Sequence, residues 1–334
     1  MDALETMQHD FYGHGKLLLT GEYFVLDGAQ ALALPTRYGQ RLQITYQAAE
    51  NPCLTWESID EQGQCWLKAH YELWHFNCLD EHPAEEAYFV QRLLRQIRKL
   101  NSHFLRDELA VHVTAKLEFS RHWGLGASST LIYNLAQWAY VNPFDLLLAV
   151  EGGSGYDIAC AQGQGPIIYH RGPLGPLWHP SRFAPDFADH LYFVYLGHKQ
   201  KTSAAIRLYS KRRPFSQDLV DYFSELTKKI EQTPSCAEFA LLLQEHEATV
   251  AAYLKLPRVQ EKYFPDFAGT VKSLGAWGGD FCLAVSEREP AYIENYFQER
   301  GLHPVLPYAA LVLTYPAEDA LEQVGSWSWK NNET

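Results

Sequence analysis

The stretch Trp123-Gly124-Leu125-Gly126-Ala127-Ser128-Ser129-Thr130 (WGLGASST) lies between a strand-like run at 109–119 and an apolar helical run at 131–140. Backbone N–H groups at a helix N-terminus are unpaired, and together with the helix dipole they favour a phosphate; glycines let that backbone approach closely. The stretch therefore predicts an anion cradle, in which the hydroxyls of Ser128 and Ser129 can reach a phosphate oxygen or Mg²⁺. Taken alone, it is more typical of a serine-capped helix that follows a tight turn.

Two familiar nucleotide motifs do not fit the chain. A P-loop needs a glycine five residues before Gly-Lys and a Ser or Thr after it, but Asp10 and Leu17 stand at those positions around Gly15-Lys16. A dinucleotide fingerprint lacks its third glycine both at 13–18 and at 124–129. Both of these common nucleotide-binding folds are therefore disfavoured.

Composition limits the class of protein. The 334 residues fit two domains better than one, and 47% hydrophobic with 20% charged residues is ordinary for a globular protein. A net charge of −12 argues against a nucleic-acid partner, because such binding depends on many Lys and Arg side chains. The six scattered cysteines indicate neither a disulfide framework nor a zinc site. With no apolar leader at 1–10 and no run of about 18 apolar residues, we expect a cytoplasmic protein without a membrane partner.

Strand-like and helix-like segments alternate along the chain. Helical spacing of apolar residues predicts helices at 87–100, 131–140, 218–230, 236–254 and 290–299. Alternating or continuous apolar runs predict strands at 15–26, 41–46, 109–119, 191–196 and 309–315, with a hairpin over 54–69. The Pro- and Gly-rich segment at 166–185 favours a domain boundary there. We therefore expect domains at 1–175 and 176–334.

Four glycine-bearing segments change the interpretation when they are read in order. They are GHGKLLLTGEYFVLDGA at 13–29, GLGASST at 124–130, GGSGYDIACAQG at 152–163 and GAWGGDFCLAV at 275–285. This order resembles the GHMP kinases, the superfamily of galactokinase, homoserine kinase, mevalonate kinase and phosphomevalonate kinase. Ala127 replaces a serine of that family's G-L-G-S-S loop, and Trp277 replaces a glycine of its third motif. Within the superfamily, the runs G-E-Y at 21–23, G-S-G-Y-D at 153–157 and G-G-D at 278–280 resemble phosphomevalonate kinases most.

The resemblance implies a fold, cofactors and a nucleotide site. The implied fold is α+β with two domains, an N-terminal ribosomal-protein-S5-like domain and a C-terminal ferredoxin-like domain. The implied cofactors are ATP and Mg²⁺, with ATP in the cleft between the domains. The residues implied in nucleotide binding are Gly124, Leu125, Gly126, Ala127, Ser128, Ser129, Gly278 and Gly279.

The same resemblance implies catalytic and metal-binding residues. Asp157 would be the base that relieves the acceptor hydroxyl of its proton, with Lys16 beside it to stabilise charge; a structural ion pair is the alternative. Ser128 would hold Mg²⁺. Mevalonate kinases place a metal-binding Glu upstream of this Asp, but that position is Leu146 here, flanked by Asp145. Glu151 is therefore the candidate second ligand, or else a solvated carboxylate at a helix end.

Substrate-binding residues are expected in three segments. Those implied are Glu22, Tyr23, Ser154, Gly155, Lys199 and Lys201. Lys199 and Lys201 follow a predicted strand in an acidic protein, which is where an anionic acceptor could be held, although two solvated lysines are the alternative.

These observations predict an ATP-dependent phosphotransferase acting on a small anionic alcohol, phosphomevalonate before mevalonate. A sugar or amino-acid alcohol acceptor stays open, as does a homodimer. The decarboxylase of the superfamily is disfavoured because those enzymes lack the lysine that Lys16 provides. A non-catalytic nucleotide-binding member of the fold is the alternative that Ala127 and Trp277 favour.

Overall fold

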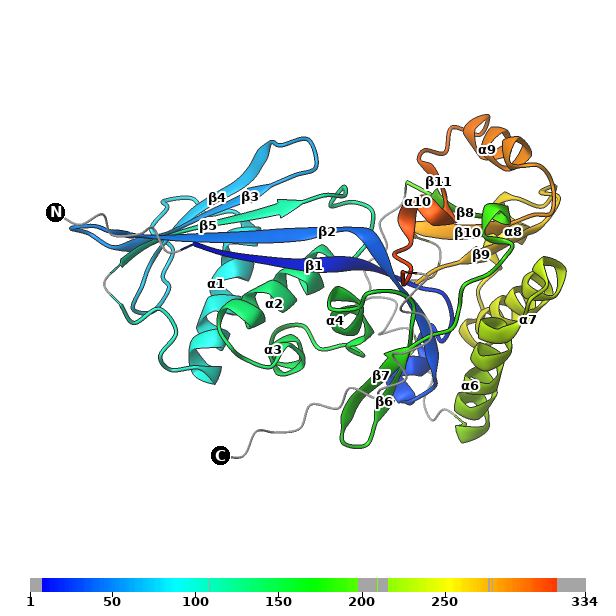
Figure 1. Ribbon diagram of the computed structural model, residues 1–334, viewed down its shortest axis with the longest axis horizontal. Coiled ribbons are helices and arrows are strands. Elements are labelled where there is room, and N and C mark those ends of the chain that lie inside the picture. The colour runs from blue at the N-terminus through cyan, green and yellow to red at the C-terminus, as the bar shows by residue number, and fades with distance from the viewer. Residues whose placement is uncertain are drawn as a thin grey trace. The chain divides into compact units, whose positions relative to one another are not determined.

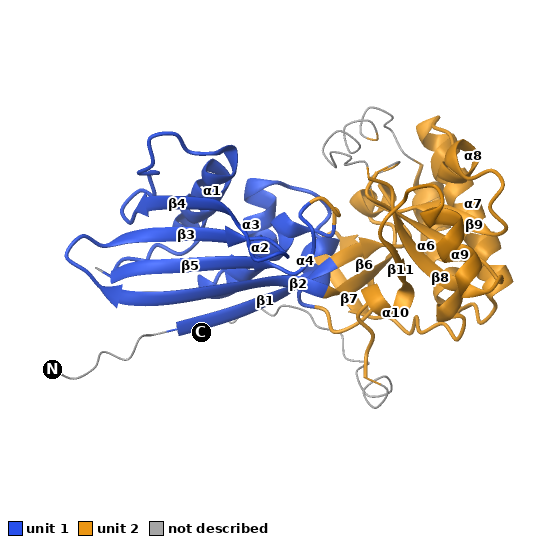
Figure 2. Cartoon of the chain, turned by 90° about the horizontal axis from the view of Figure 1, so that it is seen from above, with its two compact units in different colours: residues 1–15, 38–121, 125–162 blue, residues 16–37, 122–124, 163–334 orange. Residues whose placement is uncertain are grey.

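The computed structural model describes residues 8–107, 109–197, 209, 216–275, 277 and 279–316. Its packing divides the chain into two compact units, each discontinuous in sequence (Figure 2). Unit 1 comprises 1–15, 38–121 and 125–162, and unit 2 comprises 16–37, 122–124 and 163–334. The expected mixed α+β fold with two domains is confirmed.

Unit 1 is built on a mixed sheet, in which some strand pairs are antiparallel and one is parallel. Its strands are β1 (Gln8–Leu18), β2 (Ala31–Ala48), β3 (Cys53–Ile59), β4 (Cys65–Glu72) and β5 (Leu109–Leu117). The order is β4-β3-β5-β2, with β1 also paired to β2. The predicted hairpin is β3–β4, and β5 pairs parallel to β3 and antiparallel to β2. The last residues of β1 and the first residues of β2 belong to unit 2.

The helices of unit 1 cover one face of this sheet (Figure 1). They are α1 (Glu85–Leu100), α2 (Ala127–Trp138), α3 (Pro143–Val150) and α4 (Tyr156–Ala161). Helix α2 ends at Trp138, and Asn142 begins α3: its side chain accepts a hydrogen bond from the Phe144 N–H, and Pro143 occupies the first turn. The predicted helices at 87–100 and 131–140 are therefore confirmed.

Unit 2 contains a hairpin and a second sheet. The hairpin is β6 (Ile167–Gly172) with β7 (Gly175–Pro180), and the start of β2 pairs with β6. The second sheet has the order β11-β8-β10-β9, all antiparallel, from β8 (Leu191–Tyr195), β9 (Thr270–Ser273), β10 (Phe281–Val285) and β11 (Val305–Pro307). The helices are α6 (Gln217–Gln232), α7 (Cys236–Leu254), α8 (Val259–Tyr263), α9 (Pro290–Gln298) and α10 (Tyr308–Leu311). The described part of unit 2 also contains the short 3-10 helices η1 (Phe24–Asp27) and η2 (Ala188–His190).

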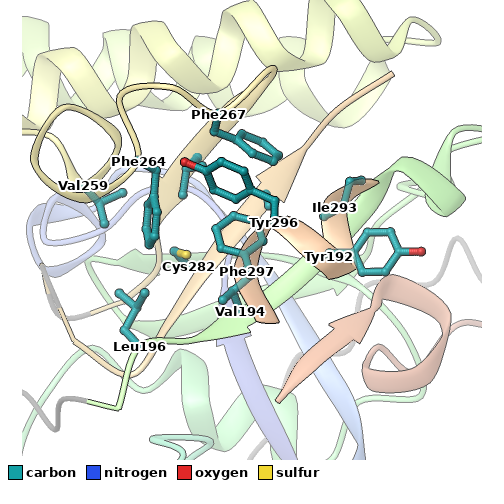
Figure 3. Close-up of a cluster of buried hydrophobic side chains, with 12 residues drawn as sticks. Tyr192, Val194, Leu196, Val259, Phe264, Phe267, Cys282, Ile293, Tyr296 and Phe297 are labelled. Carbon is teal, nitrogen blue, oxygen red and sulfur yellow. The ribbon is translucent and has the colours of Figure 1, made fainter. Parts of the chain in front are cut away.

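An aromatic core fixes the second sheet of unit 2. Figure 3 shows side chains of β8 and β10 packed against rings from α9 and the segment after α8. The Phe297 ring lies 5.1 Å from that of Phe264 and 5.2 Å from that of Phe267, centroid to centroid. All five residues of β10 are buried, because both faces of this strand are covered. The strand that follows the glycine loop is thus held on both sides.

Two predicted strands are wrong. The run at 15–26 ends as a strand at Leu18, because Gly21 and Tyr23 have φ of +80° and +65° and turn the chain into η1. The run at 309–315 is not a strand either. Tyr308 and Leu311 are both buried at a helical spacing in α10, and Val312 makes only an isolated bridge with Thr36.

The Pro- and Gly-rich segment is mostly β-structure, because its residues 167–180 form the β6–β7 hairpin. Among the described helices, none combines the length and the apolar character needed to cross a membrane.

Candidate active site

The N-terminus of α2 carries most of the predicted phosphate loop. Gly126 precedes the helix with φ of +91°, and no side chain caps the first turn. Leu125 is fully buried and holds this end of the helix in the core of unit 1. Ser129 is also buried, and its hydroxyl donates to the carbonyl of Gly126 at 3.0 Å. The first-turn N–H groups of this 12-residue helix could therefore serve as anion donors, while the Ser129 hydroxyl is used inside the protein.

Ser128 makes a different contact from its neighbour. Its hydroxyl donates a hydrogen bond to the carboxylate of Glu151, the residue at the C-terminal end of α3. Glu151 is an exposed residue, but partial desolvation by its neighbours raises the pKa of its carboxyl group, and the negative charge of nearby Asp157 raises it further. The hydrogen bond from Ser128 and the charge of Arg92 act in the opposite direction. Helices α2, α3 and α4 thus bring a hydroxyl and two carboxylates together within unit 1.

These side chains fit a magnesium ion as a partial ligand set. Two carboxylates that interact unfavourably gain from a cation between them, and Mg²⁺ prefers oxygen ligands while keeping several waters. Among the described residues, no group of three or more His, Cys, Asp or Glu side chains could form a metal centre. The protein would therefore contribute Ser128 and Glu151, as the resemblance implies, with Asp157 close by.

Asp157 lies in the first turn of the short helix α4. The residue before that helix, Gly155, has φ of +92°, which explains the glycine in this segment. Ser154 and Asp157 are both partly exposed. The segment that carries the expected base is thus open to solvent on one side.

The start of the WGLGASST stretch belongs to unit 2. The Trp123 ring packs edge-on against Phe281 at 5.8 Å, and the Tyr195 hydroxyl donates to the His122 carbonyl at 3.1 Å. Lys16 donates from Nζ to the carbonyl of Gly124 at 2.8 Å. The lysine predicted from the first motif therefore contacts the second motif directly.

Gly124 is required by its surroundings. It has φ of +64°, and a Cβ there would lie 2.1 Å from Oδ2 of Asp280. Asp280 is itself left-handed, with φ of +50°. Sequence reasoning did not assign Asp280 to the site, although it ends the third motif. Lys16, Gly124 and Asp280 therefore form one local arrangement in unit 2.

The catalytic pair was predicted across the two units. Asp157 lies in unit 1 and Lys16 in unit 2, so their pairing remains a prediction. Of the expected glycine loop, Gly279 is buried and described, whereas Gly278 lies outside the described residues. Lys199 and Lys201, expected at the substrate, also lie outside them.

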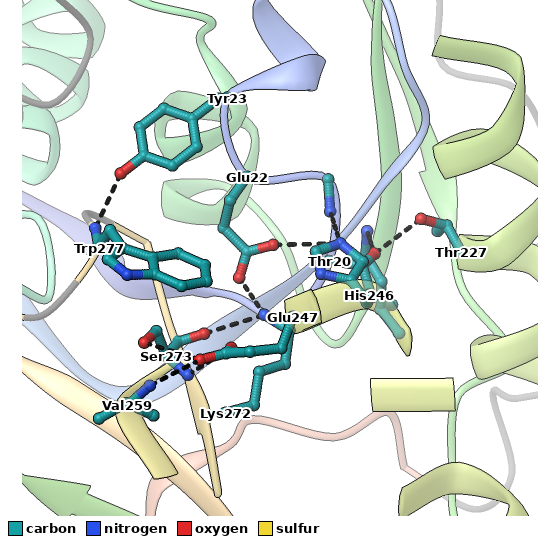
Figure 4. Close-up of polar contacts among 12 residues, drawn as sticks. Thr20, Glu22, Tyr23, Thr227, His246, Glu247, Val259, Lys272, Ser273 and Trp277 are labelled. Atoms are coloured by element: carbon teal, nitrogen blue, oxygen red, sulfur yellow. Dashed lines mark hydrogen bonds and ion pairs between the residues drawn. The ribbon is translucent and has the colours of Figure 1, made fainter. Parts of the chain in front are cut away.

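Glu22 and Tyr23, expected at the substrate, are both buried, and their contact with a substrate remains a prediction. Glu22 is 2% exposed, its carboxylate is ion-paired with Lys272, and His246 Nε2 lies 3.3 Å from its other oxygen. Tyr23 is 7% exposed, and its hydroxyl accepts a hydrogen bond from the backbone N–H of Trp277 at 2.8 Å. Figure 4 shows both residues facing β9 and the loop after it.

Sequence reasoning missed the buried charges around Glu22. Lys272, His246 and Glu247 are each at most 1% exposed. Burial lowers the pKa of His246 well below its usual value and raises that of Glu247 to about 7. The available signal was a lysine within the apolar strand-like run at 270–274 and a Glu on the inward side of the helix at 236–254.

The fold is that of solved structures of the GHMP kinase class, so the resemblance seen in the sequence is confirmed for the fold. The chain superposes on Leishmania major mevalonate kinase in complex with R-mevalonate with a TM-score of 0.62 and 16% identity, covering 94% of this chain and 99% of that one. It superposes on Streptococcus pneumoniae phosphomevalonate kinase in complex with phosphomevalonate and AMPPNP with a TM-score of 0.65 and 15% identity, covering 88% of this chain and 98% of that one. It also superposes on Staphylococcus aureus mevalonate diphosphate decarboxylase with a TM-score of 0.59 and 10% identity, covering 92% of this chain and 97% of that one.

No protein-family model matches the chain, and no curated protein sequence matches it. At these identities the likeness to solved structures extends to the fold alone.

Proposed function

We propose that the protein is an ATP-dependent kinase of the GHMP superfamily that phosphorylates a small anionic alcohol, phosphomevalonate ahead of mevalonate. The observation that carries this proposal is the contact of Ser128 with Glu151 beside Asp157, at the uncapped N-terminus of α2. It supports a site that can hold a phosphate, a cation and a general base within one unit. The fold shared with two kinases of this chemistry supports it further.

Phosphoryl transfer asks the protein mainly for positioning and charge neutralisation. The first-turn N–H groups of α2 would bind phosphate oxygens, and Ser128 with Glu151 would hold Mg²⁺. Mg²⁺, when bound, neutralises charge on the transferring group. Asp157 would accept the proton of the acceptor hydroxyl as the new P–O bond forms, while the bond from phosphorus to the leaving oxygen breaks. Lys16 would add positive charge for the same step.

The choice of acceptor depends on the motifs. Tyr23 and the G-S-G-Y-D run at 153–157 resemble phosphomevalonate kinases, and an S. pneumoniae enzyme of that name has the same fold. A decarboxylase also has this fold, so the fold does not separate the two reactions. Lys16 favours the kinase, since the decarboxylases lack the corresponding lysine.

One experiment tests the proposal. ADP release is measured with Mg-ATP and phosphomevalonate, mevalonate, homoserine or galactose, and the phosphorylated product is identified by mass spectrometry. We expect the fastest turnover with phosphomevalonate and a diphosphorylated product without loss of CO₂. Release of CO₂ would identify a decarboxylase, and preference for galactose or homoserine would change the acceptor. ATP binding without turnover on any acceptor would support the non-catalytic alternative.

A further inference from the structure

We propose that Glu22 and Tyr23 position the glycine loop at 274–280, and that Trp277 is the residue through which the loop is held. In this assignment the consecutive residues of the first motif are positioning residues and do not contact the substrate. The importance of the loop for nucleotide binding rests on the proposed function, but the contacts that hold it do not.

Glu22 fixes the strand from which the loop departs. Its carboxylate is paired with the ammonium group of Lys272 on β9, and Lys272 Nζ also donates to the carbonyl of Ser273 at 2.9 Å. Ser273 is the last residue of β9. Because this ion pair is almost fully buried, removal of one partner would leave an uncompensated charge. The direction in which the chain leaves β9 is therefore set by Glu22 through Lys272.

Glu247 holds the same residue from the other side (Figure 4). Its carboxylate accepts the backbone N–H of Ser273 at 2.8 Å, the Ser273 hydroxyl at 3.2 Å and the Val259 N–H at 3.3 Å. The backbone N–H and carbonyl of Ser273 thus both bond to buried ionisable side chains. A backbone fixed in this way at its departure point limits the loop to few conformations.

Tyr23 holds the middle of the loop. Its hydroxyl accepts the Trp277 backbone N–H at 2.8 Å, and its ring stacks on the Tyr209 ring at 5.6 Å. The indole N–H of Trp277 donates to the Pro257 carbonyl at 3.2 Å. The Trp277 ring also packs against the cluster that contains Tyr23, Phe24 and Tyr209. A glycine at 277 could keep the first hydrogen bond, but it would lose the ring and the second.

This explains the tryptophan at a position where the superfamily usually has glycine. Glycine-rich loops are flexible, and ordering such a loop on binding costs conformational entropy. The contacts of Ser273 and Trp277 restrain the chain at these two positions before a ligand arrives. Trp277 therefore favours nucleotide binding, and the same residue that suggested a non-catalytic protein is compatible with a kinase.

The test uses Tyr23→Phe in the full-length protein, because it removes one hydroxyl and keeps the packed ring. Loss of a single acceptor for the Trp277 N–H should raise the KM for ATP about tenfold, while kcat changes less. Hydrogen exchange measured on peptides covering 274–280 should become about tenfold faster and stay unchanged elsewhere. Trp277→Gly should show the same pattern, and Trp277→Phe should lie nearer the parent protein.

Tyr71→Phe is the matched control. The buried Tyr71 hydroxyl donates to the Ala87 carbonyl at 2.8 Å within unit 1, so loop exchange and the KM for ATP should equal those of the parent. If Tyr23→Phe lowers the melting temperature but leaves loop exchange and KM unchanged, Tyr23 is merely structural and the proposal is wrong. If exchange in Tyr23→Phe accelerates equally in all peptides, the proposal is also wrong. Should the parent protein not bind ATP, the proposed function fails, and the exchange measurement alone still decides whether the loop is held.

Discussion

The carboxylate of Asp280 packs against the α-carbon of Gly124, so closely that a Cβ at position 124 would lie 2.1 Å from Oδ2. On its other side Gly124 accepts a hydrogen bond from Lys16. Lys16, Gly124 and Asp280, which come from three different glycine-bearing motifs, therefore lie together within unit 2. Gly124 is needed for two separate reasons, its positive φ and the space that Asp280 occupies.

Substitution of Gly124 by Ala should separate these two reasons from each other. The left-handed backbone alone costs an alanine about 1–2 kcal/mol, and the overlap with Asp280 adds roughly 1–3 kcal/mol. We expect Gly124→Ala to lower the free energy of unfolding, measured with urea, by about 2–5 kcal/mol. Gly301→Ala in the same unit is the control, because Gly301 has φ of +74° and a Cβ added there would meet nothing within 4 Å. Equal losses in the two variants would mean that Asp280 moves away without cost.

Asp157→Asn should abolish most of the proposed phosphoryl transfer. General base catalysis contributes about 10²–10⁴-fold, so we expect kcat to fall by about that factor with little change in the KM for ATP. Asp145→Asn is the control, since Asp145 is an exposed residue in the first turn of α3. The measurement is ADP release with the preferred acceptor. Similar rates for the two variants would exclude Asp157 as the base.

Ser128→Ala should weaken the use of magnesium. The substitution removes the hydroxyl that contacts Glu151, and loss of such a group commonly costs about 10–100-fold in metal affinity. We expect the Mg²⁺ concentration for half-maximal rate to rise by about tenfold or more at saturating ATP. Ser102→Ala, on an exposed turn, should leave it unchanged. An unchanged magnesium requirement in Ser128→Ala would remove Ser128 from the metal site.

Glu247 should make stability depend on pH. Its pKa is about 7 in the folded protein, against 4.5 for the ordinary side chain, because burial disfavours the charged form. Between these values the folded state binds the proton more tightly, so the contribution is complete below about pH 4.5 and is lost as the pH rises through about 7. His246, whose lowered pKa acts in the opposite direction, is common to the parent and the variant, so the contribution of Glu247 is read from their difference. From pH 5 to 8 the free energy of urea unfolding should fall more, or rise less, in the parent than in Glu247→Gln.

The control for this pH dependence is Glu245→Gln, an exposed residue on the same helix, whose slope should match that of the parent. If Glu247→Gln retains the full slope, the buried carboxylate is already charged at pH 5 and the raised pKa is wrong.

Local patterns in the sequence predicted most of the elements. The hairpin β3–β4 and the helices α1, α6, α7 and α9 follow from short-range periodicity and turn signals, which act over a few residues. The two wrong strands failed for a common reason. Gly21 donates its N–H to His246, more than two hundred residues away, and Tyr308 is buried among distant aromatic residues. Contacts of that range leave no periodic signal.

The sequence by itself determined the order of the glycine-bearing motifs, and the resemblance of that order to the GHMP kinases implied the fold class and the residues Ser128, Glu151 and Asp157 as candidates. It could do so because a phosphate-binding turn needs glycine and hydroxyl residues next to each other in the chain. Only the tertiary structure decided what the neighbours of those residues are. Burial placed Glu22 and Tyr23 beneath the glycine loop and set Asp280 against Gly124, since desolvated charges must find partners wherever the fold brings them.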